Sequence, residues 1–160
     1  MDEIIRMQDN LLLIRRTVGW TAEEFGDRIG VTRQTINNIE SGRNRLTKTQ
    51  YIAMRSVLDA EMAQSPDETE MLRILLEILV DNPDKYSDSD REKMLLKANM
   101  MAPAILSGAS SRKEVSKEWI ATIGVIAGGA AALAAVFPLG LGVFSPVAPF
   151  IGGSWIIKTL

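Results

Sequence analysis

The chain has 160 residues, and its 18 basic and 20 acidic side chains give a formal charge of −2. This length suits one ordinary domain or two small ones. The chain contains no cysteine and no histidine, which excludes disulfides, thiolate metal sites, histidine zinc ligands and a histidine general base.

The first third of the chain has the pattern of short helices separated by glycines. We predict a first helix over residues 2–18, which Gly19 ends. The capping-box sequence from Thr21 to Glu24 predicts a second helix that reaches residue 29. Gly30 then ends this helix in a turn, because glycine tolerates the left-handed conformation that such a turn needs.

Two further helices follow this turn. Thr32 is expected to cap a third helix that runs to residue 41, with two apolar residues facing inward, Ile36 and Ile39. Gly42 ends that helix. A second capping box, from Thr47 to Gln50, opens a fourth helix, whose apolar face carries Tyr51, Met54 and Leu58.

The middle of the chain predicts two more helices. Residues 64–67 read as a linker, and Asp67 is expected to cap an apolar helix that ends near residue 80. A turn at 82–84 leads to a capping box from Ser89 to Glu92, which opens another apolar helix. Pro103 kinks or ends this helix. The small polar residues 107–111 predict a hinge, and residues 112–118 form a charged collar.

Residues around the third helix have the chemistry of a surface that binds DNA. Residues 32–55 hold five basic side chains against one acidic side chain, a local excess of +4. Asn and Gln can bond adenine bidentately, and Arg can bond guanine in the same way. We therefore expect base contacts from Arg33, Gln34, Asn37 and Asn38, and phosphate contacts from Thr32, Thr35, Arg43, Asn44 and Arg45.

This region resembles a known family. Residues from about Leu11 to Leu58 look like the helix-turn-helix domain of the phage repressor and Cro family, also called the Xre family. The matching positions are Leu11, Ile14, Arg15, Gly19, Thr21, Glu24, Phe25, Ile29, Gly30, Val31, Thr32, Ile36, Ile39, Glu40, Gly42 and Leu58. The resemblance implies a five-helix DNA-binding domain that acts as a dimer on an inverted repeat.

By position, the resemblance also assigns roles to single residues. Arg33, Gln34 and Asn38 match base-contacting sites, and Arg43 and Arg45 match a phosphate-contacting loop. Arg15 and Glu40 match an internal ion pair between the first and third helices. The chain departs from the family pattern at three places: Ala22 replaces a phosphate-contacting Gln, Leu46 a common Pro, and Lys48 an apolar residue.

The end of the chain is strongly apolar. Residues 119–157 contain no charged side chain, and about 20 apolar helical residues are enough to cross a bilayer core. We therefore expect a transmembrane helix over 119–137, with Trp119 and Trp155 as interfacial aromatics. The cations Arg112, Lys113 and Lys117 before it predict a cytoplasmic N-terminal domain.

The tail leaves alternatives open. Residues 139–157 are rich in glycine and proline, so they form either the second span of a hairpin, with Lys158 returning to the cytoplasm, or an interfacial segment. The spacing of Gly124 and Gly128 permits close contact between transmembrane helices, although it also arises by chance in an Ala/Gly-rich tail. The whole tail can instead be the buried helical core of a soluble oligomer.

Together these features predict an all-α protein with a lambda-repressor-like helix-turn-helix bundle, central helices, and a C-terminal transmembrane helix or hairpin. We divide it into residues 1–63 that bind DNA, 64–111 that link or dimerise, and 112–160 that form the collar and membrane tail. The predicted function is a repressor-type transcriptional regulator in the cytoplasmic membrane. Its expected partners are double-stranded DNA with an inverted-repeat operator, membrane lipid and a second copy of the chain.

A different class of function also fits the sequence. In that alternative the protein is a membrane scaffold whose helix-turn-helix domain grips a protein partner rather than DNA. We expect no enzymatic activity, no metal and no cofactor, because no phosphate-binding loop and no cluster of metal ligands is present in the sequence.

Overall fold

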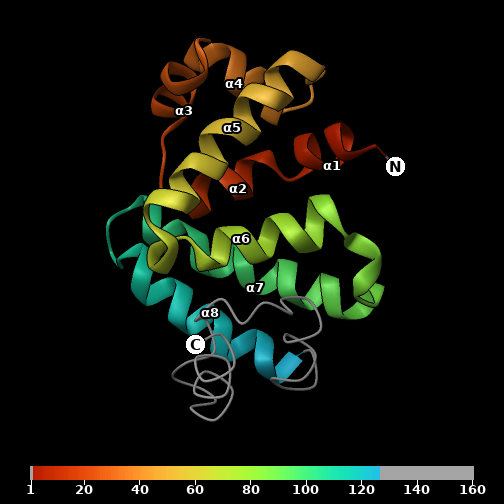
Figure 1. Cartoon of the computed structure of the whole chain (residues 1–160), viewed down its shortest axis with the longest axis vertical. Helices are drawn as coiled ribbons and strands as arrows, with labels where there is room; N and C mark the ends of the chain where they lie inside the picture. Colours follow the sequence, from red (N-terminus) through yellow and green to blue (C-terminus); the bar gives the residue numbers. More distant parts are fainter. Residues whose placement is uncertain (1, 127–160) are drawn as a thin grey trace, which may run out of the picture.

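The described part of the chain is entirely helical. The computed structural model describes residues 2–126, and Figure 1 shows α3, α4 and α5 on one side of α2, with α6, α7 and α8 on the other. An all-α fold is therefore confirmed for these residues. The elements are α1 (Glu3–Asp9), α2 (Leu11–Val18), α3 (Ala22–Ile29), α4 (Arg33–Glu40), α5 (Lys48–Gln64), the 3₁₀ turn η1 (Pro66–Glu68), α6 (Glu70–Leu76), the π-helical η2 (Glu77–Asp81), the 3₁₀ turn η3 (Pro83–Lys85), α7 (Asp88–Leu106) and α8 (Arg112–Ile126).

The first predicted helix is in fact two helices. The chain leaves helical geometry at Asn10, which has φ −110° and ψ 5° and separates α1 from α2. The Asn10 side chain donates a hydrogen bond to the carbonyl oxygen of Arg6 at 2.8 Å, and its backbone N–H bonds to the carbonyl of Gln8. A polar side chain that binds the backbone in this way competes with helix continuation.

The start signals in the helix-turn-helix region are confirmed. Thr21 with Glu24, and Thr47 with Gln50, form complete capping boxes at the starts of α3 and α5. Thr32 caps α4 by accepting a hydrogen bond from the backbone of Thr35.

The start signals predicted for the next two helices were wrong. Asp67 lies inside the turn η1, which begins at Pro66, and α6 begins only at Glu70. α7 is capped by Ser87, whose hydroxyl accepts from the backbone N–H of Asp90 at 3.1 Å, so the helix starts before the predicted box at 89–92. Pro103 lies inside α7, which continues to Leu106.

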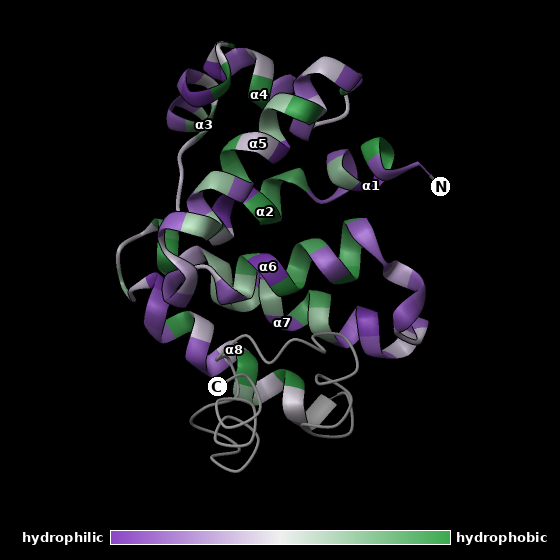
Figure 2. Cartoon of the chain, in the orientation of Figure 1, coloured by the Kyte–Doolittle hydropathy of each residue, from purple (hydrophilic) through white to green (hydrophobic). Residues whose placement is uncertain are grey.

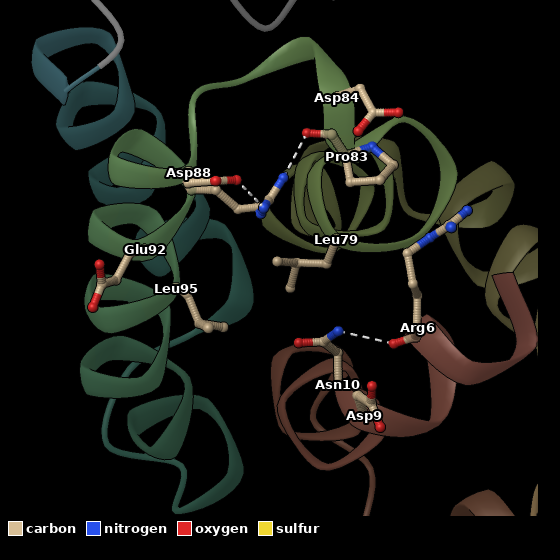
Figure 3. Close-up of a pocket in the computed structure, with 10 residues that line it drawn as sticks. Arg6, Asp9, Asn10, Leu79, Pro83, Asp84, Asp88, Glu92 and Leu95 are labelled. Atoms are coloured by element: carbon tan, nitrogen blue, oxygen red, sulfur yellow. Dashed lines mark hydrogen bonds and ion pairs between the residues drawn. The ribbon is translucent and has the colours of Figure 1, made fainter. Parts of the chain in front are cut away.

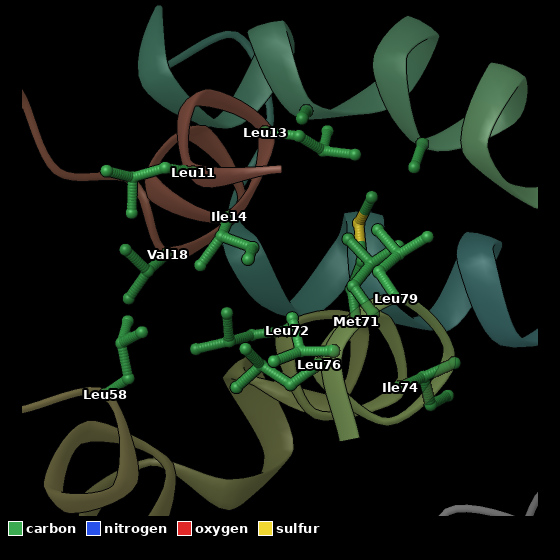
Figure 4. Close-up of a cluster of buried hydrophobic side chains, with 14 of the residues drawn as sticks. Leu11, Leu13, Ile14, Val18, Leu58, Met71, Leu72, Ile74, Leu76 and Leu79 are labelled. Atoms are coloured by element: carbon green, nitrogen blue, oxygen red, sulfur yellow. The ribbon is translucent and has the colours of Figure 1, made fainter. Parts of the chain in front are cut away.

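One hydrophobic core joins the two sides of the molecule. In α2, six of eight residues are buried, and this helix contacts both α6 and α7. Figure 4 shows the labelled apolar side chains of α2 facing those of α6 and η2, and Figure 2 shows hydrophobic residues along the facing helices. The helix-turn-helix region and the C-terminal helices therefore share one core, whereas the predicted division at residues 63 and 111 stays a prediction.

The predicted charged collar forms the first half of α8. Arg112 binds inward: its guanidinium donates to the carboxylates of Glu61 and Glu68, at 2.7 Å each, and to the carbonyl of Val18 at 3.2 Å. Close packing also marks this junction, because a Cβ on Gly19 would lie 3.1 Å from Ile105 Cγ2 and 3.7 Å from Arg112 Cδ.

The start of the apolar tail continues α8. Trp119 was predicted to lie at a membrane interface, but its side chain is fully buried, and Ile120 and Ile123 are buried with it. α8 contacts α6 and α7, so these residues cover the C-terminal helices. No helix within residues 2–126 is long and apolar enough to cross a membrane. The remainder of the predicted span, the possible hairpin, Gly128, Trp155 and Lys158 lie outside the described residues.

A buried acid lies at the start of α6. Glu70 is only 6 % exposed. One of its carboxylate oxygens accepts from Arg73 at 2.7 Å, and the other is buried without a partner within residues 2–126. Burial raises the pKa of Glu70 to about 7, although Arg73 opposes the shift. The folded protein therefore binds a proton at Glu70 more readily than the unfolded chain does.

This shift predicts a stability effect between pH 5 and 8. Because the folded pKa of Glu70 is raised above its unfolded value, the stability linked to this group is present at low pH and is lost as pH rises through about 7. Glu70→Gln stays neutral, so its free energy of unfolding should rise relative to wild type as pH rises from 5 to 8, measured by urea denaturation. Glu114→Gln is the control, because the pKa of Glu114 is lowered and its effect should be flat over this range. Parallel curves for wild type and Glu70→Gln would contradict the prediction.

Candidate nucleic-acid interface

The turn between α3 and α4 fixes how α4 is presented. Gly30 has φ +76°, and the N–H of Val31 bonds to the carbonyl of Gly26 at 2.9 Å. A Cβ on Gly26 would lie only 2.6 Å from the carbonyl oxygen of Val31, so the helix and the turn touch through bare backbone. α3 and α4 therefore form a closely packed pair, with α4 held against α3 by one face.

The other face of α4 is polar and open to solvent. Ile36 and Ile39 point into the core, whereas Arg33, Gln34 and Asn37 are exposed and Asn38 is half-buried. The side-chain amide of Gln34 donates to that of Asn38 at 2.9 Å. The structure thus brings the four predicted base-contacting residues together on one short helix.

The first turn of α4 carries the two predicted threonines. Thr32 is the cap, and its hydroxyl lies 3.0 Å from that of Thr35. Free backbone N–H groups and the helix dipole make such a helix start favourable for a phosphate group. Ala22, which stands where the family has a phosphate-contacting Gln, is buried at the start of α3 and offers no such contact.

The loop after α4 holds the other predicted phosphate contacts. Arg43, Asn44 and Arg45 are exposed, as is Lys48 at the start of α5. The loop itself is ordered by its backbone, because Asn44 N–H bonds to the Asn38 carbonyl at 3.0 Å. Leu46, where the family often has Pro, is buried and anchors the loop in the core.

The exposed arginines of this surface lack a counter-charge within the part of the chain that the structure describes. Within residues 2–126, no carboxylate forms an ion pair with Arg33, Arg43 or Arg45. Their charge is therefore available to an anionic partner.

Arg15 and Glu40 form a buried ion pair that holds α4 on α2. The Arg15 guanidinium donates to both carboxylate oxygens of Glu40, at 2.5 and 3.0 Å, and to the carbonyl of Trp20 at 2.9 Å. Both side chains are 8 % exposed. The nearby Trp20 ring is covered by the guanidinium of Arg28 at 4.0 Å. This pair holds the C-terminal end of α4, where Glu40 lies, against α2.

The structure adds two features that the sequence did not indicate. The side chain of Gln8 in α1 reaches the loop after α4, and no local sequence pattern predicts such a long-range contact. A cleft of ≈ 500 Å³ lies between the joint of α1 and α2 and the elements η2, η3 and α7 (Figure 3). It contains none of the predicted site residues. Within residues 2–126, no cluster of acidic residues could hold a metal ion.

Two short helices joined by a glycine turn, the second with an open polar face, define a helix-turn-helix domain. Residues 11–64 match the family described as "Helix-turn-helix", over about a third of the chain. This segment is a helix-turn-helix domain of the Xre/Cro-like type, the kind of DNA-binding domain typical of non-enzymatic regulators. The predicted family resemblance is confirmed. Searches of curated proteins and of solved structures found no match.

Breaking the ion pair between Arg15 and Glu40 should lower the free energy of unfolding more than breaking an exposed ion pair does. Glu40→Ala leaves the buried Arg15 guanidinium bonded to the Trp20 carbonyl but without a counter-ion, and such a loss costs about 3–5 kcal/mol of unfolding free energy. Lys93→Ala is the control, because Lys93 lies 3.9 Å from Asp90 with 61 % of its side chain exposed, and it should cost less than about 1 kcal/mol. Denaturant unfolding measures both. Equal effects of the two variants would show that the buried pair contributes no more than a surface pair.

Proposed function

We propose that this protein is a sequence-specific DNA-binding transcriptional regulator of the repressor type. The observation that carries the proposal is the arrangement of exposed side chains around α4. Arg33, Gln34, Asn37 and Asn38 share its open face, and the next loop carries arginines that form no ion pair within residues 2–126. A short helix with amide and guanidinium groups in its first turns suits insertion into the major groove, where these groups bond base edges.

The polar and charged side chains of this surface have two proposed roles. Arg33, Gln34, Asn37 and Asn38 read bases, while Arg43, Asn44 and Arg45, with Thr32 and Thr35, hold the phosphate backbone. Phosphate contacts set position and affinity but carry no sequence information, so the two groups have separable effects.

Dimer formation is part of the proposal. A two-fold dimer on an inverted repeat places one α4 in each half-site. α7 carries two apolar side chains on its outer surface, Leu96 and Met100, which are 65 % and 69 % exposed and lie one helical turn apart. They support α7 as the contact with a second copy. Two chains per operator are the expected stoichiometry.

Binding to a random pool of duplexes tests the function. The full chain should be used, because α6 and α7 cover α2. At two salt concentrations, sequencing of the retained DNA should reveal an inverted repeat, with affinity that falls steeply as salt rises. Arg33→Ala or Gln34→Ala should cost about 1–3 kcal/mol on this site and relax its sequence preference, whereas Arg45→Ala should weaken all sequences alike and lower the salt slope by about one.

Lys117→Ala is the matched control for charge, because it removes one exposed cation from α8, which lies on the opposite side of α2 from α4 and is not the proposed dimer helix. It should leave both the preference and the slope nearly unchanged. Unchanged binding by Arg33→Ala would overturn the assignment of base contacts. If the wild-type chain bound no duplex at low salt, the alternative function, a scaffold that binds a protein partner, would be favoured.

We also propose that residues 127–160 attach the protein to the cytoplasmic membrane, with the DNA-binding domain in the cytoplasm. The support is composition: Lys158 is the single charged side chain in this segment. The full chain should float with phospholipid vesicles in a density gradient. Val136→Lys should reduce this, because it places a cation inside the uncharged stretch 127–157, and a lysine at the centre of a spanning helix costs about 2.5–3.5 kcal/mol. Wild-type protein that stays at the bottom of the gradient would contradict the attachment.

A further inference from the structure

The short helix α1 lies between the DNA-facing loop and the C-terminal helices. It contacts α4 and α5 on one side and η2 on the other. It precedes the matched segment 11–64, so the family likeness assigns it no role.

Gln8 in α1 binds the loop through its whole side-chain amide. Its nitrogen donates to the carbonyls of Ile39 at 2.9 Å and Asn44 at 2.8 Å. Its oxygen accepts from the backbone N–H of Leu46 at 2.9 Å. Both donors and the carbonyl oxygen of one side chain are therefore used on the backbone that leads from α4 to α5.

These three bonds lie where the exposed cations attach. Arg43 and Arg45 flank Asn44, whose carbonyl is bound, and Leu46 follows directly. Other restraints on the loop are the bond from Gly42 N–H to the Ile39 carbonyl at 3.1 Å, the bond from Asn44 N–H to the Asn38 carbonyl at 3.0 Å, and the burial of Leu46. The backbone from which both arginines project is thus held in large part from α1.

α1 is itself fixed, so Gln8 is a rigid support. Met7 is fully buried beneath it. Arg6 donates to the carbonyl of Val80 at 2.7 Å, and the hydroxyl of Tyr51 donates to Glu3 at 2.9 Å. These contacts tie α1 to both η2 and α5.

We propose that Gln8 is a positioning residue for recognition of the DNA backbone. It acts through the loop, by holding Arg43 and Arg45 in place before the phosphates arrive. This inference rests on the proposed DNA-binding function. A loop that is already ordered binds more tightly, because less conformational entropy is lost on association. Base reading by α4 is left untouched, since Gln8 contacts only its last turn.

Two nearly isosteric variants test the role. Gln8→Met keeps the length of the side chain and loses all three hydrogen bonds. Gln8→Glu keeps an acceptor for Leu46 N–H but sets a carboxylate oxygen against two carbonyl oxygens. The control is Ser116→Ala, which is also uncharged and removes two hydrogen bonds of a buried hydroxyl, to Met71 N–H and to the carbonyl of Glu68, in the C-terminal helices.

Four readouts on the full chain separate positioning from stability: the dissociation constant on the selected duplex at two salt concentrations, the ranking of retained sequences, amide hydrogen exchange at Leu46, and the melting temperature. Gln8→Met should bind all duplexes roughly 10-fold more weakly, with the ranking kept, a smaller salt slope and faster exchange at Leu46. Gln8→Glu should also bind more weakly, while Leu46 stays protected. Ser116→Ala should lower the melting temperature and leave DNA binding unchanged.

Wild-type affinity in Gln8→Met, with rapid exchange at Leu46, would overturn the positioning role and leave the proposed function standing. A loss of binding that follows the melting temperature equally in Gln8→Met and Ser116→Ala would also overturn it. If the wild-type chain bound no duplex, the proposed function would fail, and this inference would fail with it.

Discussion

The architecture depends on the burial of α2 on both sides. An amphipathic helix on a protein surface usually buries one stripe of residues, but here only Leu12 and, in part, Arg16 of α2 remain accessible. One side of the helix supports the helix-turn-helix pair through Arg15, and the apolar residues pack against α6 and α7. The helix-turn-helix half therefore shares one core with the C-terminal helices through α2.

Cations that are largely buried are paired with carboxylates, whereas the cations near α4 are exposed to solvent. Cations that are removed from water are paired: Arg15 with Glu40, Arg55 with Asp81, and Arg112 with Glu61 and Glu68. Such pairing is required because an unpaired buried charge is strongly destabilising. The cations near α4 are exposed instead, which costs little in folding and leaves them free for a polyanion. A protein of net charge −2 can thus present a local basic surface.

Local signals in the sequence predicted local structure well. Thr21, Thr32 and Thr47 marked helix starts correctly, because each cap uses atoms within three residues. The break at Asn10 escaped, because its side chain supports helix continuation or interruption depending on which carbonyl it reaches. The contacts of Gln8 escaped for a different reason: its partners lie 31 to 38 residues away, so no local pattern indicates them. Trp119 was misplaced because an apolar run looks alike whether lipid or protein covers it, and only the packing of α8 on α6 decides between them.

Gly19 shows how one missing methyl group can set the spacing between two halves of a protein. Its positive φ of 84° already favours glycine, since a Cβ is strained in that conformation. Independently, a Cβ at this position would lie 3.1 Å from Ile105 Cγ2, which is closer than ordinary packing, whereas Arg112 Cδ at 3.7 Å would be in ordinary contact. Two independent constraints thus act on this one residue: its backbone conformation and the space beside it. Removing one of them leaves the other in place. At this junction a change in the size of residue 105 is therefore expected to be tolerated better than any side chain at position 19.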